Sequence, residues 1–126
     1  IGRLVGSEMC IRDRNNIKED DIILDIGPKT LDKIKRIIEN SETVLWNGPA
    51  GYFENPNFAN GSYDIAKAIT KKNKNNSIYS VVGGGDTIAL INKIKLIENF
   101  NFVSTAGGAF LEYLEGKELP GIKALN

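Results

Sequence analysis

The fold is decided by residues 78–90, which read Ile78-Tyr79-Ser80-Val81-Val82-Gly83-Gly84-Gly85-Asp86-Thr87-Ile88-Ala89-Leu90. A β-branched run leads into three glycines, and an apolar pattern with helical spacing begins directly behind them. A strand that passes through a glycine turn into a helix aims backbone N–H groups and the positive helix end at an anion. Glycines suit this turn because they allow a ligand to approach the backbone closely and they tolerate positive φ.

Asp86 follows these glycines directly, where its carboxylate would repel a bound phosphate. A Mg²⁺ ion between the two groups removes the conflict, because hard cations bind carboxylate and phosphate oxygens together. The stretch therefore indicates a magnesium–nucleotide phosphate site. The alternative is a tight turn between strand and helix, with Asp86 as an ordinary helix N-cap.

The composition is typical of one soluble domain or part of one, with 126 residues, 41% hydrophobic and 25% charged. Sixteen basic residues balance sixteen acidic ones, so we expect no binding to nucleic acid or to an anionic membrane. Histidine is absent and Cys10 is the single cysteine, which excludes imidazole chemistry and an internal disulfide from this chain. With no signal-peptide pattern and no run of about 18 apolar residues, we expect a cytoplasmic protein.

Residues 1–14 form a compositional break, with three of the four arginines and the only methionine and cysteine, and we leave them out of the fold. Beyond them, strands alternate with helices. Strands are expected at 22–26, 43–46, 78–82 and 100–103, and helices at 30–39, 62–70, 86–95 and 107–115, with Thr30 and Ser62 as N-caps.

Helices that cross between short β-branched strands predict an α/β fold, with a parallel sheet and helices on both faces. Ligands of such sheets bind at the carboxyl ends of the strands. We therefore expect the loops that begin at Gly27, Asn47, Gly83 and Thr105 to open on one side.

The loop 47–61 is long for a compact domain, and long ordered loops usually carry function. It begins Asn47-Gly48-Pro49-Ala50-Gly51-Tyr52-Phe53-Glu54. An amide can contact phosphate oxygens, and a carboxylate can accept hydrogen bonds from ribose hydroxyls. The alternative is a surface loop with Glu54 in solvent.

A second junction of strand, glycines and helix is Ser104-Thr105-Ala106-Gly107-Gly108-Ala109. Two helix N-termini that face one crevice can hold a phosphate at each end of a transfer path. A glycine-lined packing contact is the alternative. Two common phosphate motifs are absent: a dinucleotide fingerprint would need glycine in place of Ile88, and Pro28 interrupts the P-loop-like ending at Gly27.

Four motifs in this order resemble the phosphoglycerate kinase family. They are Leu24-Asp25-Ile26-Gly27-Pro28-Lys29-Thr30; Trp46-Asn47-Gly48-Pro49 with Gly51 and Phe53-Glu54; Val82-Gly83-Gly84-Gly85-Asp86-Thr87; and Ser104 to Ala109 with the Leu114-Glu115-Gly116-Lys117 and Leu119-Pro120-Gly121 that follow. The resemblance implies that residues 15–126 are the C-terminal portion of a Rossmann-like nucleotide-binding domain, hence a partial domain. Residues 1–14 lie outside it, and a sequencing or assembly artefact there is a hypothesis that resequencing across Arg14–Asn15 would settle.

The resemblance also implies a reaction: reversible phosphoryl transfer between 1,3-bisphosphoglycerate and ADP, which gives 3-phosphoglycerate and ATP in glycolysis, with Mg²⁺ as cofactor. It assigns the Mg²⁺ to Asp86 and the nucleotide phosphates to Gly84, Gly85 and Thr87. The resemblance further implies that the full-length enzyme is a monomer.

The same resemblance assigns Asn47 to the phosphate chain, Pro49 and Gly51 to the nucleoside pocket and Glu54 to the ribose hydroxyls. Gly107 and Gly108 would donate N–H groups to the transferring phosphoryl group, where fixed donors lower the barrier. The chain departs from the family pattern at Ile23 and Ala106, which replace usual glycines, and at Phe110, which replaces a usually small residue.

The matching region has no histidine and a single arginine, Arg36, so it cannot build a basic site for the acid substrate. We expect 3-phosphoglycerate and 1,3-bisphosphoglycerate to bind only to the full-length enzyme, and the isolated chain to be inactive. An uncovered sheet edge and apolar face predict a marginal fold. Two alternatives remain open: a non-catalytic Mg–nucleotide-binding module, and a structural piece that folds only with a partner half.

Overall fold

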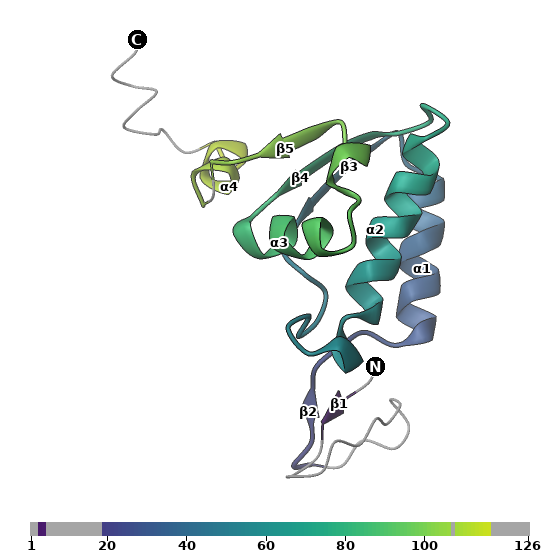
Figure 1. Ribbon diagram of the computed structural model, residues 1–126, viewed down its shortest axis with the longest axis vertical. Coiled ribbons are helices and arrows are strands. Elements are labelled where there is room, and N and C mark those ends of the chain that lie inside the picture. The colour runs from purple at the N-terminus through teal and green to yellow at the C-terminus, as the bar shows by residue number, and fades with distance from the viewer. Residues whose placement is uncertain (1–2, 5–18, 107, 117–126) are drawn as a thin grey trace.

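The computed structural model describes residues 3–4, 19–106 and 108–116 (Figure 1). Its centre is a parallel sheet of three strands in the order β3–β4–β5, formed by Thr43–Asn47, Tyr79–Gly83 and Phe102–Ser104. Trp46 lies beside Val82, and Val82 lies beside Val103. The predicted α/β class with a parallel sheet is confirmed.

Helices connect these strands, as the alternating pattern predicts. They are α1 (Pro28–Glu39), α2 (Asn60–Asn73), α3 (Gly85–Lys93) and α4 (Gly108–Leu114), with short 3₁₀ helices η2 (Pro56–Phe58) and η3 (Ile97–Asn99). In Figure 1, α1 and α2 lie side by side, α3 lies against the sheet, and α4 follows the end of β5.

Two predicted helix caps are wrong. Helix α1 begins at Pro28, before Thr30. Proline suits the first helical position, because a backbone N–H there finds no partner within the helix and proline has no N–H to leave unpaired. Helix α2 begins at Asn60, so Ser62 lies inside its first turn. The Ser62 hydroxyl instead accepts a hydrogen bond from the N–H of Ala50 at 2.8 Å, which ties the loop before α2 to the helix.

The core lies on one face of the sheet. Trp46 and Val82 point into it, where they pack with buried side chains of all three neighbouring helices: Ile38 of α1, Ile65, Ala66 and Ile69 of α2, and Leu90 and Ile91 of α3. Leu45, Val81 and Phe102 form the neighbouring row on the opposite face. Because successive side chains of a strand alternate between faces, this row points away from the core.

The opposite face is largely exposed, with 45% of Leu45, 51% of Phe102 and 51% of Tyr79 accessible to solvent. Helices α1, α2 and α3 pack on the core face. Helix α4 meets the opposite face, because the ring of Phe110 lies 3.0 Å from a Cβ built on Gly83, which points to the same side as Val81. Elsewhere on that face Leu45, Tyr79 and Phe102 stay exposed. The uncovered apolar face expected for a partial domain is therefore present.

The expected strand at 22–26 does not join the parallel sheet. Strand β2 is only Ile22–Ile23, and it pairs antiparallel with β1 (Arg3–Leu4), which comes from the segment left out of the fold. Just beyond β2, the Leu24 carbonyl accepts from the N–H of Tyr52 at 2.7 Å, and Asp25 folds its carboxylate onto the N–H of Ile26 at 2.8 Å. These bonds turn the chain out of the extended ladder.

Candidate functional site

Three loops open at the carboxyl edge of the sheet. Asn47, Gly83 and Ser104 are the last residues of their strands and stand side by side in the register. The loops that begin at Asn47, Gly83 and Thr105 therefore share one side, as predicted. Gly27 follows no strand of this sheet, although the neighbouring segment 24–26 contacts the loop after β3.

The glycine turn between β4 and α3 has the backbone geometry that its sequence predicts. Gly84 has φ +90°, which side-chain-bearing residues rarely adopt, and α3 starts at Gly85 immediately behind it. Apart from its chain neighbours and the backbone of its own helix, no heavy atom of the described residues lies within 4 Å of a Cβ built on Gly85. The N-terminus of α3 is thus open to a ligand, and the exposed Asp86 lies in its first turn.

Asn47 faces this turn from the end of β3. Its side-chain oxygen lies 3.0 Å from a Cβ built on Gly83 and 3.3 Å from one built on Gly84. That oxygen is buried and has no hydrogen-bond donor in the described part of the chain. A buried polar atom without a partner is expensive, so a ligand or its water that supplies a donor would be favoured there.

Thr87 lies in the first turn of α3, directly behind Asp86. Its side chain is 0% exposed, and its hydroxyl oxygen accepts a hydrogen bond from the N–H of Gly48 at 2.7 Å. This bond joins the loop after β3 to the first turn of α3. The hydroxyl keeps its proton as a hydrogen-bond donor.

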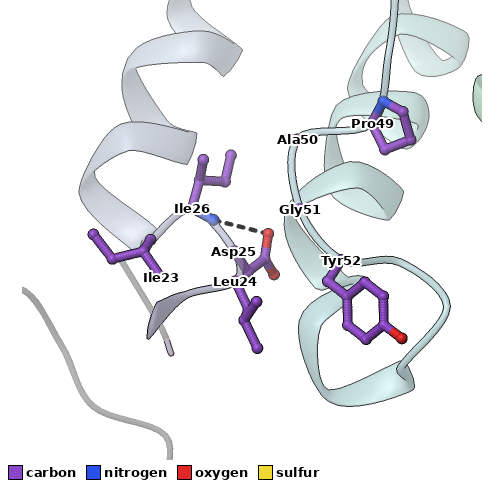
Figure 2. A pocket seen from close by; sticks show the side chains of 8 residues that line it. All are labelled: Ile23, Leu24, Asp25, Ile26, Pro49, Ala50, Gly51 and Tyr52. Atoms are coloured by element: carbon purple, nitrogen blue, oxygen red, sulfur yellow. Dashed lines mark hydrogen bonds between the residues drawn. The ribbon is translucent and has the colours of Figure 1, made fainter. Parts of the chain in front are cut away.

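A cleft of about 320 Å³ lies between the segment 23–26 and the loop after β3 (Figure 2). It is lined by Ile23, Leu24, Asp25, Ile26, Pro49, Ala50, Gly51 and Tyr52. The structure thus brings together Pro49 and Gly51, both predicted to line a nucleoside pocket. Its volume is at the lower end of the range for small-molecule sites, about 300–1,000 Å³.

Two further predicted residues can be placed around this cleft. Ile23, a departure from the family pattern, forms part of its wall and is half exposed. Glu54 is exposed in the turn that follows Tyr52 and is not among the lining residues.

Asp25 is a site residue that the sequence analysis did not single out. It is only 8% exposed, and its carboxylate accepts hydrogen bonds from the N–H of Ile26 at 2.8 Å and of Gly61 at 3.2 Å. Burial raises the pKa of this carboxyl above its ordinary value, and the hydrogen bonds from Gly61 and Ile26 oppose the rise. The sequence feature that could have indicated it is the charge of Asp25 within the apolar run 22–26.

The second glycine junction is described only in part. Gly107 lies outside the described residues, and Gly108 begins α4. The ring of Phe110 lies 3.0 Å from a Cβ built on Gly83, which places α4 beside the glycine turn. Phe110 fills space there that a small residue would leave open.

Asp86 is the carboxylate positioned to hold a metal at the glycine turn. The described residues contain no cluster of three or more His, Cys, Asp or Glu side chains that could bind a metal by themselves. A single carboxylate fits Mg²⁺ that arrives with a nucleotide, because Mg²⁺ usually combines one or two carboxylates with substrate phosphates and water.

Of the helices described, none is both long and apolar enough to cross a membrane.

Comparisons with known proteins give one consistent result. The family model described as phosphoglycerate kinase matches residues 5–117, and so begins inside the segment 1–14 that we expected to lie outside the family region. The phosphoglycerate kinase of Orientia tsutsugamushi (strain Ikeda) is 53% identical over 103 residues, which cover 82% of this chain and 25% of that protein. That of Chelativorans sp. (strain BNC1) is 43% identical over 120 residues, 95% of this chain and 30% of that protein.

A solved structure agrees with these relatives. The structure of phosphoglycerate kinase from Coxiella burnetii superposes with a TM-score of 0.82 at 40% identity, covering 94% of this chain and 30% of that one. The chain thus spans less than a third of the length of each of these proteins.

Proposed function

The chain belongs to the phosphoglycerate kinase family, and from this premise we propose that it carries the Mg–nucleotide half of a phosphoglycerate kinase active site. The whole enzyme would transfer a phosphoryl group reversibly between 1,3-bisphosphoglycerate and ADP, giving 3-phosphoglycerate and ATP. It would act in glycolysis as a cytoplasmic monomer.

The observation that carries the proposal is the junction of two loops at the sheet edge. Asn47 and Gly83 are register partners, and the bond from Gly48 to Thr87 fixes the loop after β3 against the start of α3. A nucleotide in the cleft between 23–26 and 49–52 would therefore reach with its phosphates toward the open N-terminus of α3.

Within this site, Asp86 would hold the Mg²⁺ of the nucleotide, and the ion would neutralise phosphate charge when bound. The N–H groups of Gly84 and Gly85 and the hydroxyl of Thr87 would bind the phosphates, and Asn47 would contact the phosphate chain. Such fixed donors favour the transition state when they point to where charge develops.

The remaining roles follow the family resemblance. Pro49 and Gly51 would contact the nucleoside, and Glu54 would accept from the ribose hydroxyls once nucleotide is bound. Gly107 and Gly108 would donate to the transferring phosphoryl group. Because Arg36 is the one arginine of residues 15–126 and lies exposed on α1, we propose that the acid substrate binds to parts of the enzyme outside this chain.

A chimaera tests this function. Residues 19–116 replace the aligned segment of the Orientia tsutsugamushi enzyme, and ATP formation from 1,3-bisphosphoglycerate is followed in a coupled assay. We expect an active enzyme, with at least about a 100-fold loss on Asp86→Ala. A folded chimaera without activity, beside an active parent enzyme, would contradict the proposal.

The second candidate, a non-catalytic Mg–nucleotide-binding module, is favoured by the lack of a basic substrate site in this chain. It predicts that the chimaera binds Mg-ADP and remains inactive. The purified chain alone should show no turnover under either reading, and turnover by it would contradict both.

A further inference from the structure

Asp25 lies between Gly51, in the loop after β3, and Gly61, in the first turn of α2. A Cβ built on Gly51 would come within 2.6 Å of its carboxylate oxygen, and one built on Gly61 within 2.5 Å. Real Cβ atoms do not approach other atoms so closely, so both backbones pack directly against the carboxylate. Figure 2 shows the Asp25 side chain pointing from its own segment toward the backbone of Ala50 and Gly51.

Hydrogen bonds fix this arrangement from both sides. The carboxylate accepts from the N–H of Gly61, in the first turn of α2, and from the N–H of Ile26. Beside it, the N–H of Tyr52 donates to the carbonyl of Leu24 at 2.7 Å. The bend at Gly51 is thus held between the segment 24–26 and the start of α2.

This bend is one wall of the candidate nucleoside cleft. Pro49, Gly51 and Tyr52 line the cleft on one side, and Asp25 lines it from the other. If the carboxylate no longer accepted both N–H groups, it would leave its place against the Gly51 backbone, and that wall of the cleft would lose the contact that sets its position. The glycine turn at residues 83–85 does not contact Asp25 and would keep its shape.

We infer that Asp25 is a positioning residue for nucleoside binding: its buried carboxylate holds the Gly51 bend against the start of α2 and so sets the width of the cleft. The inference rests on the proposed function, because it assumes that the cleft takes the nucleoside of ADP. Asp25 contacts neither the phosphates nor the metal in this account, and it acts through the backbone of residues 49–52.

The test uses the purified chain with two probes, Mg-ADP and Mg-pyrophosphate, titrated by calorimetry. Mg-pyrophosphate reports on the glycine turn alone, whereas Mg-ADP also needs the cleft. Asp25→Asn keeps the size of the side chain but sets an NH₂ group against one of the two N–H donors. Gly51→Ala disturbs the same packing contact from the side of the loop. Asp32→Asn, at an exposed position of α1, is the matched control.

We expect Asp25→Asn and Gly51→Ala each to raise the Kd for Mg-ADP by at least about tenfold, with the Kd for Mg-pyrophosphate unchanged within about twofold. Asp32→Asn should leave both unchanged. Unaltered Mg-ADP binding would overturn the inference. Equal weakening of the binding of both probes, or loss of the folded state, would also overturn it, because either result would make Asp25 a residue of general stability. An unsubstituted folded chain that binds neither probe would instead overturn the proposed function, and the inference with it.

Discussion

The backbone N–H of Gly48 donates to the hydroxyl oxygen of Thr87 at 2.7 Å, and this bond couples the loop after β3 to the first turn of α3. Gly48 follows β3 and Thr87 lies in the first turn of α3, so the contact spans two neighbouring strands of the sheet. A buried hydroxyl therefore joins the proposed phosphate site to the candidate nucleoside cleft. Each of the following substitutions tests one part of that assembly.

Replacing Thr87 with valine should uncouple the loops. Valine has nearly the shape of threonine, but it leaves the Gly48 N–H without a buried acceptor, which costs about 1–3 kcal/mol. We expect a free energy of unfolding lower by this amount in urea titrations, together with weaker Mg-ADP binding. Thr87→Ser keeps the hydroxyl and is the control. Equal binding by the valine and serine variants would show that the bond does not position the loops.

The glycine turn predicts opposite effects at adjacent positions. Gly84 has φ +90°, so Gly84→Ala should destabilise the chain by about 1–3 kcal/mol. Gly85 starts α3, and a Cβ there meets no described atom within 4 Å, so Gly85→Ala should stabilise the helix by up to about 1 kcal/mol. Thermal unfolding of the two variants measures the difference. Similar losses at both positions would contradict this backbone geometry.

Asp25 should make stability depend on pH. Burial raises its pKa in the folded chain above the ordinary value of 3.8, with the hydrogen bonds from Gly61 and Ile26 opposing. The folded chain then binds this proton more tightly than the unfolded chain, so the contribution to stability is greatest below pH 3.8 and declines as the pH rises through the raised pKa. Asp25→Asn removes the titration.

We therefore expect the difference in the free energy of unfolding, unsubstituted chain minus Asp25→Asn, to decrease as the pH rises from 3.8 through the raised pKa of the folded chain. Urea unfolding of both proteins at a series of pH values measures it. Parallel curves over that range would show that the carboxyl has the same pKa in the folded and unfolded chains.

The exposed sheet face predicts self-association. Phe102 lies on the edge strand β5, in the row that it forms with Leu45 and Val81, and is 51% exposed. Apolar side chains gathered on one face favour contact between molecules. Phe102→Gln should shift sedimentation profiles toward the monomer, whereas Ile37→Gln, at an exposed position of α1, should not. Equal association of both variants would place the contact elsewhere.

The sequence predicted the parts of the fold that depend on local pattern. The alternation of β-branched runs with helical spacing located β3, β4 and β5, and the glycine turn at residues 83–85 located the start of α3 to within one residue. Parallel pairing then brought Asn47 and Gly83 to one edge, as expected for strands that run in the same direction.

The remaining features depend on contacts between distant residues. Ser62 has the right side chain for an N-cap, yet it bonds Ala50 instead, and nothing local distinguishes these two uses. The run 22–26 has a strand-like composition, but Asp25 finds its partner at Gly61, and the strand ends at Ile23. Thr87 was predicted as a phosphate ligand, and its bond to Gly48 cannot be read from either segment alone.

The most direct test of the central claim is calorimetric titration of the folded chain with ADP, with and without Mg²⁺, beside Asp86→Ala and the control Asp32→Asn. We expect the unsubstituted chain and the control to bind ADP only when Mg²⁺ is present, and Asp86→Ala to abolish this binding. Mg-independent binding of ADP, an Asp86→Ala variant with unchanged affinity, or a folded chain that binds no Mg-ADP would each contradict it.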